Sequence, residues 1–258
     1  MRNDDASGRL PLDDELVAAL AGAGRVMAFT GAGMSAESGV PTFRDAQTGL
    51  WQRYDPTELA SPEAFERDPA LVWGWYAWRR ERAAAASPHA GHRALADWER
   101  HVAELTVATQ NVDGLHQQAG STRVLELHGN LHRDICSAEG HRVSGPTPPR
   151  ASGEPPLCPA CGAPIRPDVV WFGEMLPRRA WDGALAAARA ANVLLSIGTS
   201  SLVQPAASIP LQALDAGATV VEINPEPTPL SSQVHYRLPG SAAAVLPRLV
   251  AAVGGRSG

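Results

Sequence analysis

A chain of 258 residues, of which 44% are hydrophobic and 19% charged, has the size and composition of one large folded domain or of a large domain that carries a smaller one. The formal net charge of −5 is spread along the chain without a run of like charges, which argues against a nucleic-acid-binding surface. Residues 1–12 contain no apolar segment of the secretory type, and no apolar run approaches the length of a membrane span. We therefore expect a cytoplasmic protein without nucleic acid or membrane as a partner.

In chain order, short apolar strands alternate with helices. Helical periodicity over residues 13–23 ends at the glycines Gly22 and Gly24. Apolar runs then predict five strands, at residues 26–30, 105–109, 124–127, 193–197 and 219–223. Further helices are expected at residues 180–191 and 202–216. This alternation predicts an α/β fold, with a Rossmann-like parallel sheet covered by helices on both faces.

Polar loops follow the predicted strands directly. Because the carboxyl ends of parallel strands share one edge of a sheet, these loops are expected to line a single crevice. The third strand leads into His128. The residues that follow the other four strands are Gly31, Ala32 and Gly33; Gln110, Asn111, Val112 and Asp113; Gly198, Thr199 and Ser200; and Asn224 and Glu226.

Two segments interrupt the alternation. Residues 45–87 contain a Trp-rich helical stretch, and residues 129–172 contain the cysteines and a loop rich in Pro, Gly and Ser. We expect both to form a small helical and zinc-ribbon-like domain without a large apolar core of its own. The Rossmann-like domain then comprises residues 12–44, 88–128 and 173–250.

The first of these loops satisfies a dinucleotide-binding pattern. Gly31, Gly33 and Ala36 follow a predicted strand with the spacing Gly-x-Gly-x-x-Gly/Ala, in which glycines let the backbone approach a pyrophosphate. The second strand that ends in an acid about 20 residues on, typical of dehydrogenases, is missing. The pattern therefore favours a bound dinucleotide used for chemistry other than hydride transfer.

Four longer motifs resemble the signatures of the sirtuin family. Residues 31–44 match the first signature, residues 109–116 the second, residues 127–129 the third and residues 198–205 the fourth, in the family's order. The resemblance covers roughly residues 24–248. It implies an enzyme that consumes NAD as a co-substrate, transfers an acyl group from lysine side chains of protein substrates to ADP-ribose, and releases nicotinamide.

The resemblance also implies roles for individual residues. His128 is the candidate base, because an imidazole titrates near neutral pH, and Asn111 and Asp113 complete the catalytic set. Gln110, Asn111, Val112 and Asp113 are expected around the nicotinamide and its ribose. The other residues expected to bind NAD are Gly31, Ala32, Gly33, Glu37, Phe43, Arg44, Gly198, Thr199, Ser200, Asn224, Glu226 and Ala242.

The Trp-rich segment suggests which acyl group is removed. Tyr76 and Arg79 stand three residues apart on a predicted helix and therefore share a face, where a phenol and a guanidinium together can bind a carboxylate. This pair resembles class III sirtuins, which remove succinyl, malonyl and similar acidic groups. Ala60 resembles the small residue that leaves room in such a pocket. Acetyl-lysine is expected to be accepted as well.

Three cysteines are too few for a disulfide framework and indicate a metal instead. Cys136 and the pair Cys158 and Cys161 resemble three of the four thiolates of the family's structural zinc site. The fourth ligand is open between Glu139 and His141, because zinc accepts carboxylate oxygen and imidazole nitrogen, and zinc binding itself stays open with three thiolates.

Other functions remain open on the sequence. Within enzymes, the alternatives are a deacetylase-only sirtuin and a mono-ADP-ribosyltransferase. Outside them, the alternative is a non-catalytic NAD-binding sensor. The sequence leaves the oligomeric state undetermined, with a monomer as the working expectation.

Overall fold

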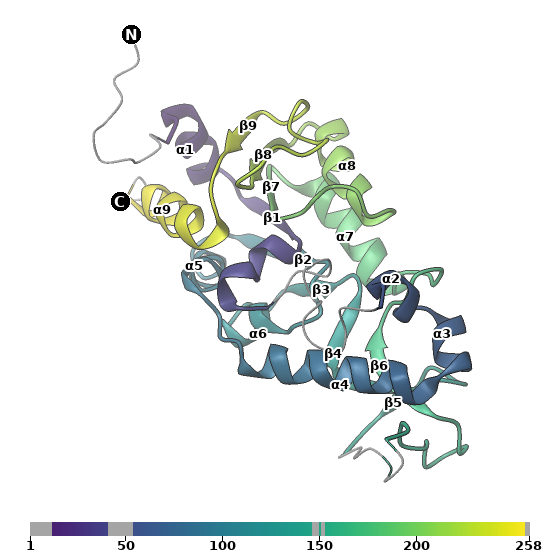
Figure 1. The fold of residues 1–258 in the computed structure, drawn as a ribbon. Coiled ribbons are helices and arrows are strands. Elements are labelled where there is room, and N and C mark those ends of the chain that lie inside the picture. Colours follow the sequence, from purple (N-terminus) through teal and green to yellow (C-terminus); the bar gives the residue numbers. More distant parts are fainter. Residues whose placement is uncertain (1–11, 41–53, 146–149, 151–152, 256–258) are drawn as a thin grey trace.

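The computed structural model describes residues 12–40, 54–145, 150 and 153–255, and it contains a larger parallel sheet and a smaller antiparallel one (Figure 1). The six-stranded sheet has the order β3-β2-β1-β7-β8-β9, with every neighbouring pair parallel. Its strands are β1 (Arg25–Thr30), β2 (Glu104–Thr109), β3 (Val124–Glu126), β7 (Val193–Ile197), β8 (Thr219–Ile223) and β9 (Tyr236–Leu238). All five strands predicted from the apolar runs are present, and β9 was not predicted.

Helices cover both faces of this sheet, as expected for the predicted fold class. Successive side chains of a strand point to opposite faces, so Val26 and Ala28 of β1 join one apolar cluster while Met27 and Phe29 join the other. The first cluster is completed by α1 (Asp14–Ala21), α5 (Ala90–Glu99) and α9 (Ala242–Gly254). The second is completed by α7 (Arg178–Ala190), η4 (Ala206–Ser208) and α8 (Ile209–Asp215).

The connection after β1 departs from a regular Rossmann unit. Two short 3₁₀ turns, η1 (Ala32–Met34) and η2 (Ala36–Ser38), follow β1 directly. The chain continues through residues 41–53, outside the described residues, to the helices of the small module. The strand order changes direction at β1, whose neighbours are β2 and β7, so the loops after β1 and β7 meet at the carboxyl edge of the sheet.

The smaller part combines three helices with a three-stranded sheet. Its helices are α2 (Pro56–Leu59), α3 (Pro62–Arg67) and α4 (Pro69–Ala85), and its strands are β4 (Gly129–Cys136), β5 (Arg142–Val143) and β6 (Ile165–Val169). Each helix begins after a residue whose side chain accepts a backbone N–H hydrogen bond, namely Asp55, Ser61 and Asp68, and each has Pro in its first turn.

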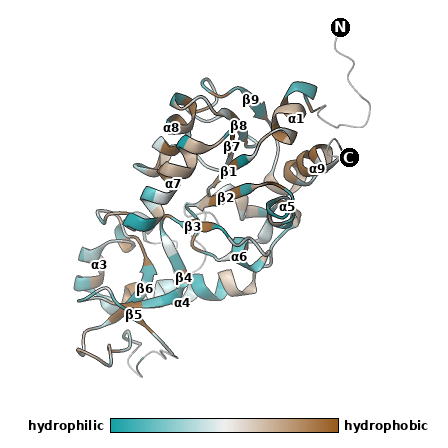
Figure 2. Ribbon diagram, turned by 180° about the vertical axis from the view of Figure 1, so that it is seen from behind, coloured by the Kyte–Doolittle hydropathy of each residue, from teal (hydrophilic) through white to brown (hydrophobic). Residues whose placement is uncertain are grey.

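The prediction that this module has no large apolar core is wrong. Trp75, Tyr76 and Val72 of α4 pack with Leu131 and Trp171 from the other segment in one buried cluster. The two segments are far apart in the sequence and neither is apolar enough alone, so the core arises only when they pair. Figure 2 shows the difference in local hydropathy: α9, which covers the large sheet, is coloured hydrophobic, whereas β4 of the small module is mostly coloured hydrophilic.

The strands of the six-stranded sheet fall within residues 12–44, 88–128 and 173–250, and the three-stranded sheet falls within 129–172. The division into two domains with these boundaries stays a prediction. In the part of the chain that the structure describes, none of the helices combines the length and the hydropathy needed to cross a bilayer.

Candidate active site

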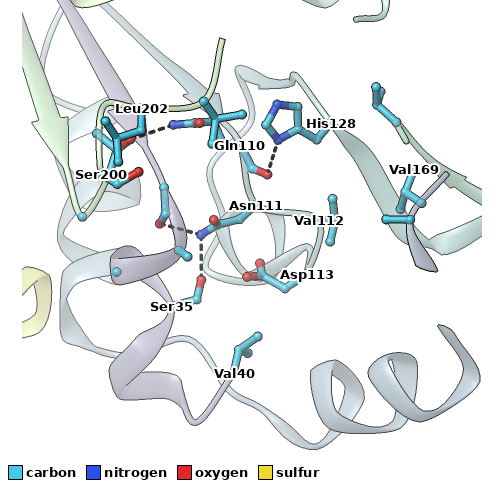
Figure 3. A pocket seen from close by; sticks show the side chains of 18 of the residues that line it. Ser35, Val40, Gln110, Asn111, Val112, Asp113, His128, Val169, Ser200 and Leu202 are labelled. Atoms are coloured by element: carbon cyan, nitrogen blue, oxygen red, sulfur yellow. Dashed lines mark hydrogen bonds between the residues drawn. The ribbon is translucent and has the colours of Figure 1, made fainter. Parts of the chain in front are cut away.

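A cavity of about 670 Å³ lies at the carboxyl edge of the parallel sheet, between it and the small module. The loops after β1, β2, β7 and β8 line one side, and residues of α4 and β6 line the other. Figure 3 shows Asn111 and Asp113 of the loop after β2 and, apart from them, Val169 of β6. The predicted residues that line it are Gly31, Ala32, Gly33, Ala60, Tyr76, Arg79, Gln110, Asn111, Val112, Asp113, His128, Gly198, Thr199, Ser200, Asn224 and Glu226. Residues predicted from separate motifs therefore meet in one space.

The loops after β1 and β7 touch through their backbones. The Gly31 N–H donates to Ile197 O at 3.0 Å, and the Gly33 N–H donates to Gly198 O at 2.8 Å. A Cβ at Gly31 would lie 2.8 Å from Thr199 Cα, and one at Gly198 would lie 2.4 Å from Met34 N. Only glycine permits this approach, so the motif glycines are required here by packing as well as by any phosphate they bind.

The Asn111 side chain is held inside the site by two hydrogen bonds. Its Nδ2 donates to Gly31 O and to Ser35 Oγ, both at 3.0 Å (Figure 3). Gln110 Nε2 donates to Thr199 Oγ1 at 3.0 Å. The loop after β2 is thereby tied to the loops after both β1 and β7, and the Oδ1 atom of Asn111 is left for other partners.

The orientation of His128 is set by one backbone contact. Its Nδ1 lies 3.0 Å from Gln110 O, and since a carbonyl oxygen only accepts, Nδ1 carries the proton (Figure 3). In the neutral ring, Nε2 is then the free base. Burial disfavours the imidazolium and lowers the pKa of His128 below its ordinary value, although the Gln110 carbonyl opposes this. The ring is therefore ready to accept a proton at neutral pH.

Asp113 is a buried carboxyl group in the loop after β2, with 3% of its surface exposed. Its side chain accepts the Leu115 N–H at 2.9 Å. Burial raises its pKa, while the hydrogen bonds from Leu115 and Ser35 and the charges of His132 and Arg79 lower it in part. A carboxyl group in this position can accept hydrogen bonds from a ligand's hydroxyl groups.

Tyr76 and Arg79 line the cavity from α4, as their spacing predicted. Tyr76 is 2% exposed, and burial raises its pKa to about 12, so the phenol is neutral. Its Oη accepts the indole N–H of Trp171 at 2.9 Å, which leaves the phenol proton to donate elsewhere. The Arg79 Cζ lies 5.6 Å from the Tyr76 ring centroid. A phenol donor and a guanidinium therefore adjoin each other in the cavity wall.

Ala60 also lines the cavity and is 3% exposed. Its carbonyl oxygen accepts the Phe172 N–H at 2.9 Å, so α2 is joined to the segment after β6. Trp171 contacts Phe65 and Tyr76, and the Arg166 guanidinium lies 3.9 Å from its ring centroid. This side of the cavity is thus a packed aromatic wall with one small residue in it.

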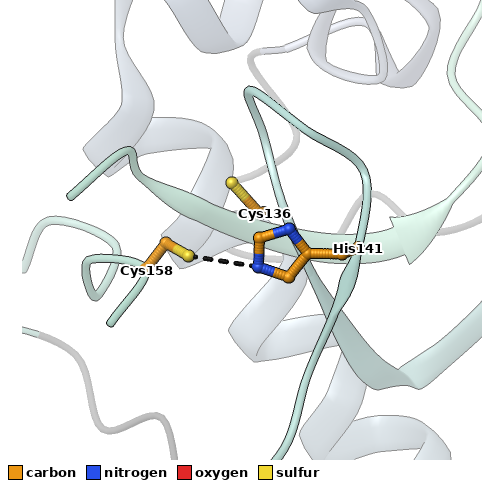
Figure 4. Close-up of side chains that lie close together, drawn as sticks. All are labelled: Cys136, His141 and Cys158. Atoms are coloured by element: carbon orange, nitrogen blue, oxygen red, sulfur yellow. Dashed lines mark hydrogen bonds between the residues drawn. The ribbon is translucent and has the colours of Figure 1, made fainter. Parts of the chain in front are cut away.

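Two of the cysteines, Cys136 and Cys158, lie beside His141 in the small module (Figure 4). The donor atoms of Cys136, His141 and Cys158 all lie within 4.8 Å of one another. Cys136 Sγ is 3.5 Å from Cys161 Sγ, and Cys158 Sγ is 3.4 Å from His141 Nε2. The pKa of the Cys136 thiol is lowered, chiefly because the backbone N–H of Glu139 donates a hydrogen bond to it. The Glu139 carboxylate lies 3.3 Å from His141 Nδ1, and its side chain is 62% exposed.

Some predicted residues do not line the cavity. Glu37 Oε2 instead accepts the Ala243 N–H at 2.9 Å, in the first turn of α9, and Ala242 is the buried first residue of that helix. Phe43 and Arg44 lie outside the described residues. The roles of these four residues in NAD binding stay predictions.

Several lining residues were missed by the sequence analysis. Ser35 lies inside the glycine-rich motif, so its position already offered a signal. Trp171 and Val169 line the cavity because β6 pairs with β4, which no local pattern reveals. Thr228 lies beyond β8 and its hydroxyl is held by the buried Glu222. Only the folded chain brings these last three to the site.

Glycine-rich loops, an uncharged imidazole and a cavity at the carboxyl edge of a parallel sheet define the site class as that of a nucleotide-dependent α/β enzyme. Comparison with known proteins identifies the family. The Sir2 family model matches residues 31–205, and the chain belongs to the Sir2 family.

Curated relatives match over nearly the whole chain. An NAD-dependent protein deacylase of Methylococcus capsulatus is 50% identical over 250 residues, which are 95% of this chain and 98% of that protein. The NAD-dependent protein deacylase 1 of Pseudomonas aeruginosa is 52% identical over 241 residues, which are 91% of this chain and 96% of that protein.

Solved structures agree with the fold. A Sir2 homologue in complex with NAD is 43% identical, with a TM-score of 0.88 and coverage of 96% of both chains. A mutant Sir2 homologue in complex with 2′-O-acetyl ADP ribose is 45% identical, with a TM-score of 0.87 and coverage of 95% of this chain and 98% of that one.

Proposed function

We propose that the chain is an NAD-dependent protein deacylase that acts on acylated lysine side chains of other proteins and favours acyl groups ending in a carboxylate. The acyl group is transferred to ADP-ribose, and nicotinamide is released. Family membership and the names of relatives about 50% identical support the general reaction. The observation that carries the proposal is His128, which lines the cavity with Nδ1–H committed to the Gln110 carbonyl.

His128 acts as the base through Nε2. NAD supplies the electrophilic C1′ of its nicotinamide ribose when it is bound, and a ribose hydroxyl must lose a proton for the acyl group to move. The lowered pKa of His128 supports this role, because the neutral form that accepts the proton predominates at pH 7. The Gln110 carbonyl keeps the ring from rotating and stabilises the imidazolium that results.

The loop after β2 binds the nicotinamide end. Asn111 presents its Oδ1 atom, since Nδ2 is committed to Gly31 and Ser35, and Asp113 presents a carboxyl group that accepts from amide or hydroxyl donors. Val112 and Gln110 complete this wall. Apolar side chains such as Leu131 and Trp171 also line the cavity and exclude water that would hydrolyse NAD unproductively.

The loops after β1, β7 and β8 bind the phosphates and the adenosine. The bare backbone of the Gly31–Gly33 turn lets a pyrophosphate approach closely, although the Gly31 and Gly33 N–H groups donate to Ile197 O and Gly198 O, and Thr199 and Ser200 add hydroxyl groups. Asn224 and Glu226 lie on the adenosine side. Asn224 Nδ2 donates to Thr199 O at 2.9 Å, which joins these two loops. Glu37 and Ala242 then act on the adenosine side indirectly, by fixing the start of α9.

Tyr76 and Arg79 bind the carboxylate of the acyl group, and Ala60 makes room for it. The Trp171 N–H occupies the acceptor position of the Tyr76 oxygen, so the phenol proton is directed to another acceptor. A charged guanidinium beside it provides the countercharge that a buried carboxylate needs. Acetyl-lysine lacks the carboxylate that these two donors would bind.

A zinc ion suits the cluster of Cys136, Cys158, Cys161 and His141. Three thiolates and one imidazole nitrogen are an established donor set for structural zinc. The geometry favours His141 over Glu139 as the fourth ligand: His141 Nε2 faces Cys158, while Glu139 lies against His141 Nδ1. A carboxylate in that position orients a metal-bound histidine. Such an ion stabilises the module and takes no part in acyl transfer.

Protein substrates are the partners that this activity requires, and we place the enzyme in the cytoplasm, acting as a monomer without nucleic acid or membrane. The cysteines support the location, because all three are free thiols in a cluster suited to metal.

The reaction is tested by mass spectrometry of succinyl-lysine and acetyl-lysine peptides incubated with the enzyme, with and without NAD. We expect acyl loss only with NAD, equimolar nicotinamide, and a new O-acyl-ADP-ribose. Transfer of ADP-ribose to protein would indicate a mono-ADP-ribosyltransferase. Tight NAD binding without any product would indicate a sensor.

A further inference from the structure

Three histidine rings pack in a row, tilted or edge to face, and none of them lines the cavity. His89 precedes α5, His92 lies in its first turn, and His116 lies on α6 (Leu115–Gln118). The ring centroids of His89 and His92 are 4.3 Å apart, and those of His92 and His116 are 5.0 Å apart. His92 and His116 are 0% and 1% exposed. The mechanism above uses none of the three.

His116 hydrogen bonds to the end of the central strand. Its Nε2 lies 3.0 Å from Thr30 Oγ1, and Thr30 Oγ1 donates to Thr109 Oγ1 at 2.8 Å. Thr109 Oγ1 also accepts the backbone N–H of Asn111 at 3.0 Å. Because the Thr30 hydroxyl has one proton and donates it to Thr109, its oxygen accepts from His116, so Nε2 carries the proton of the neutral ring.

This chain of hydrogen bonds is completely buried. Thr30 is 0% exposed and Thr109 is 3% exposed, and they are register partners at the carboxyl ends of β1 and β2. Each strand end leads directly into a loop that lines the cavity. The two hydroxyl groups therefore fix the separation of these loops, and His116 fixes the hydroxyl groups.

The ring of His116 is held uncharged. Burial lowers the pKa of His116 to about 4, and its Nδ1 has no hydrogen-bond partner among the described residues. A second proton would thus lack an acceptor. The rings of His92 and His89 pack beside it, and His89 is anchored in turn: its Nδ1 accepts the Gly91 N–H and its Nε2–H donates to Met34 O.

We propose that His116 is a positioning residue for Asn111: its Nε2–H, through the hydroxyl groups of Thr30 and Thr109, fixes the backbone from which Asn111 enters the cavity. The Asn111 amide then finds Gly31 O and Ser35 Oγ in the opposite loop. A ring that only filled space would need no donor aimed at the strand end. This inference rests on the proposed NAD-dependent activity and assigns a residue outside the cavity to it.

The test uses three variants of the full-length protein. His116→Phe keeps the ring volume but removes the donor, and His116→Gln places a carboxamide Nε2 where the imidazole Nε2 lies. His92→Phe is the matched control, since neither ring nitrogen of His92 hydrogen bonds to a described residue. Thermal midpoints establish that each variant is folded at the assay temperature, and kcat/KM for NAD and for the acyl-peptide are measured at pH 7.5.

We expect His116→Phe to lower kcat/KM for NAD by about 10- to 100-fold, because a misplacement of about 1 Å in an active-site group can cost about 100-fold. His116→Gln should recover most of that loss, and His92→Phe should lose little. Equal losses in His116→Phe and His92→Phe, or no recovery with Gln in a folded protein, would leave His116 with a packing role only. A wild-type protein that consumes no NAD would instead overturn the proposed function.

Discussion

The two regions of the molecule are stabilised differently. The parallel sheet is sandwiched between two apolar clusters, so the loops at its edge extend from a rigid support. Among the described residues, the small module has one compact aromatic cluster and, at its far end, a smaller buried group of Trp73, Cys136, Cys158 and Ile165. Ion pairs such as Arg80 with Asp134 hold its sheet to α4.

This difference assigns different tasks to the regions. In the proposed function, residues of the sheet loops, such as His128 and Asn111, act at the reacting end of NAD. Residues of the module, such as Tyr76 and Arg79, bind the acyl group. Catalysis and acyl selection should therefore respond to separate mutations.

The largest effect is expected from the sheet side of the cavity. His128→Ala should lower kcat by about 10²- to 10⁴-fold, because it removes the base. NAD binding, measured by calorimetry, and the thermal midpoint should stay near the wild-type values. Turnover that survives in a folded variant would remove His128 as the base.

The module should instead depend on its metal. Elemental analysis is expected to give one zinc per chain, and His141→Ala should lose the metal and lower the thermal midpoint by several degrees. His141→Cys restores a thiolate and should keep the zinc. Glu139→Gln should weaken zinc binding by about tenfold, in line with other partners that orient metal-bound histidines. A zinc content near zero in the wild-type protein contradicts the zinc site.

Arg79→Met tests whether acyl selection can be changed without changing catalysis. It should lower desuccinylation by about 10- to 100-fold, the range for losing a charge-assisted hydrogen bond, and leave deacetylation nearly unchanged. The matched control is Arg80→Met, because Arg80 pairs with Asp134 outside the cavity lining. Equal losses on both substrates in Arg79→Met would show that the pair does not select the carboxylate.

Stability should fall with acid because His92 is a buried, uncharged histidine. Burial lowers the pKa of His92 to about 2, whereas the ordinary value is 6.5, so between these values the unfolded chain binds the extra proton and folding is weakened as pH falls. At pH 5 this amounts to about 2 kcal/mol for His92. Urea unfolding of His92→Phe should therefore change less between pH 7 and pH 5 than that of the wild type, and an identical change contradicts a buried neutral ring.

The smallest expected effect is a shift in the pH profile. The pKa of His128 is lowered by burial, so the neutral base form persists below pH 6.5. On the acid side of the pH profile, the midpoint of the decline in kcat/KM should therefore lie below pH 6.5. An acid limb with its midpoint above 6.5 would contradict the environment described for His128.

The sequence predicted the sheet better than the module. The strands at residues 26–30 and 193–197 are continuous apolar runs, a local signal that survives folding, and the motif residues after them meet as expected. The predicted helix over residues 202–216 is shorter in the structure, which has only η4 and α8 there. Local periodicity does not determine where such a helix begins.

The small module was harder to predict from the sequence because the contacts that form its core join segments far apart in the chain. Its apolar core forms between α4 and strands more than 40 residues away, so neither segment appears apolar enough alone. Likewise, Trp171 was not predicted to donate to Tyr76, and the choice between Glu139 and His141 depends on which side of the imidazole faces the thiols. The spacing of residues in the sequence does not determine how these side chains are oriented.

The most direct test of the account is the ratio of kcat/KM values for two peptides of one sequence, one succinylated and one acetylated on the same lysine, at saturating NAD. We predict NAD-dependent removal of both groups with succinyl strongly favoured, because Tyr76 and Arg79 are then paired with a carboxylate. Removal of acetyl alone would contradict the assignment of the acyl pocket, and removal of neither would contradict the deacylase itself.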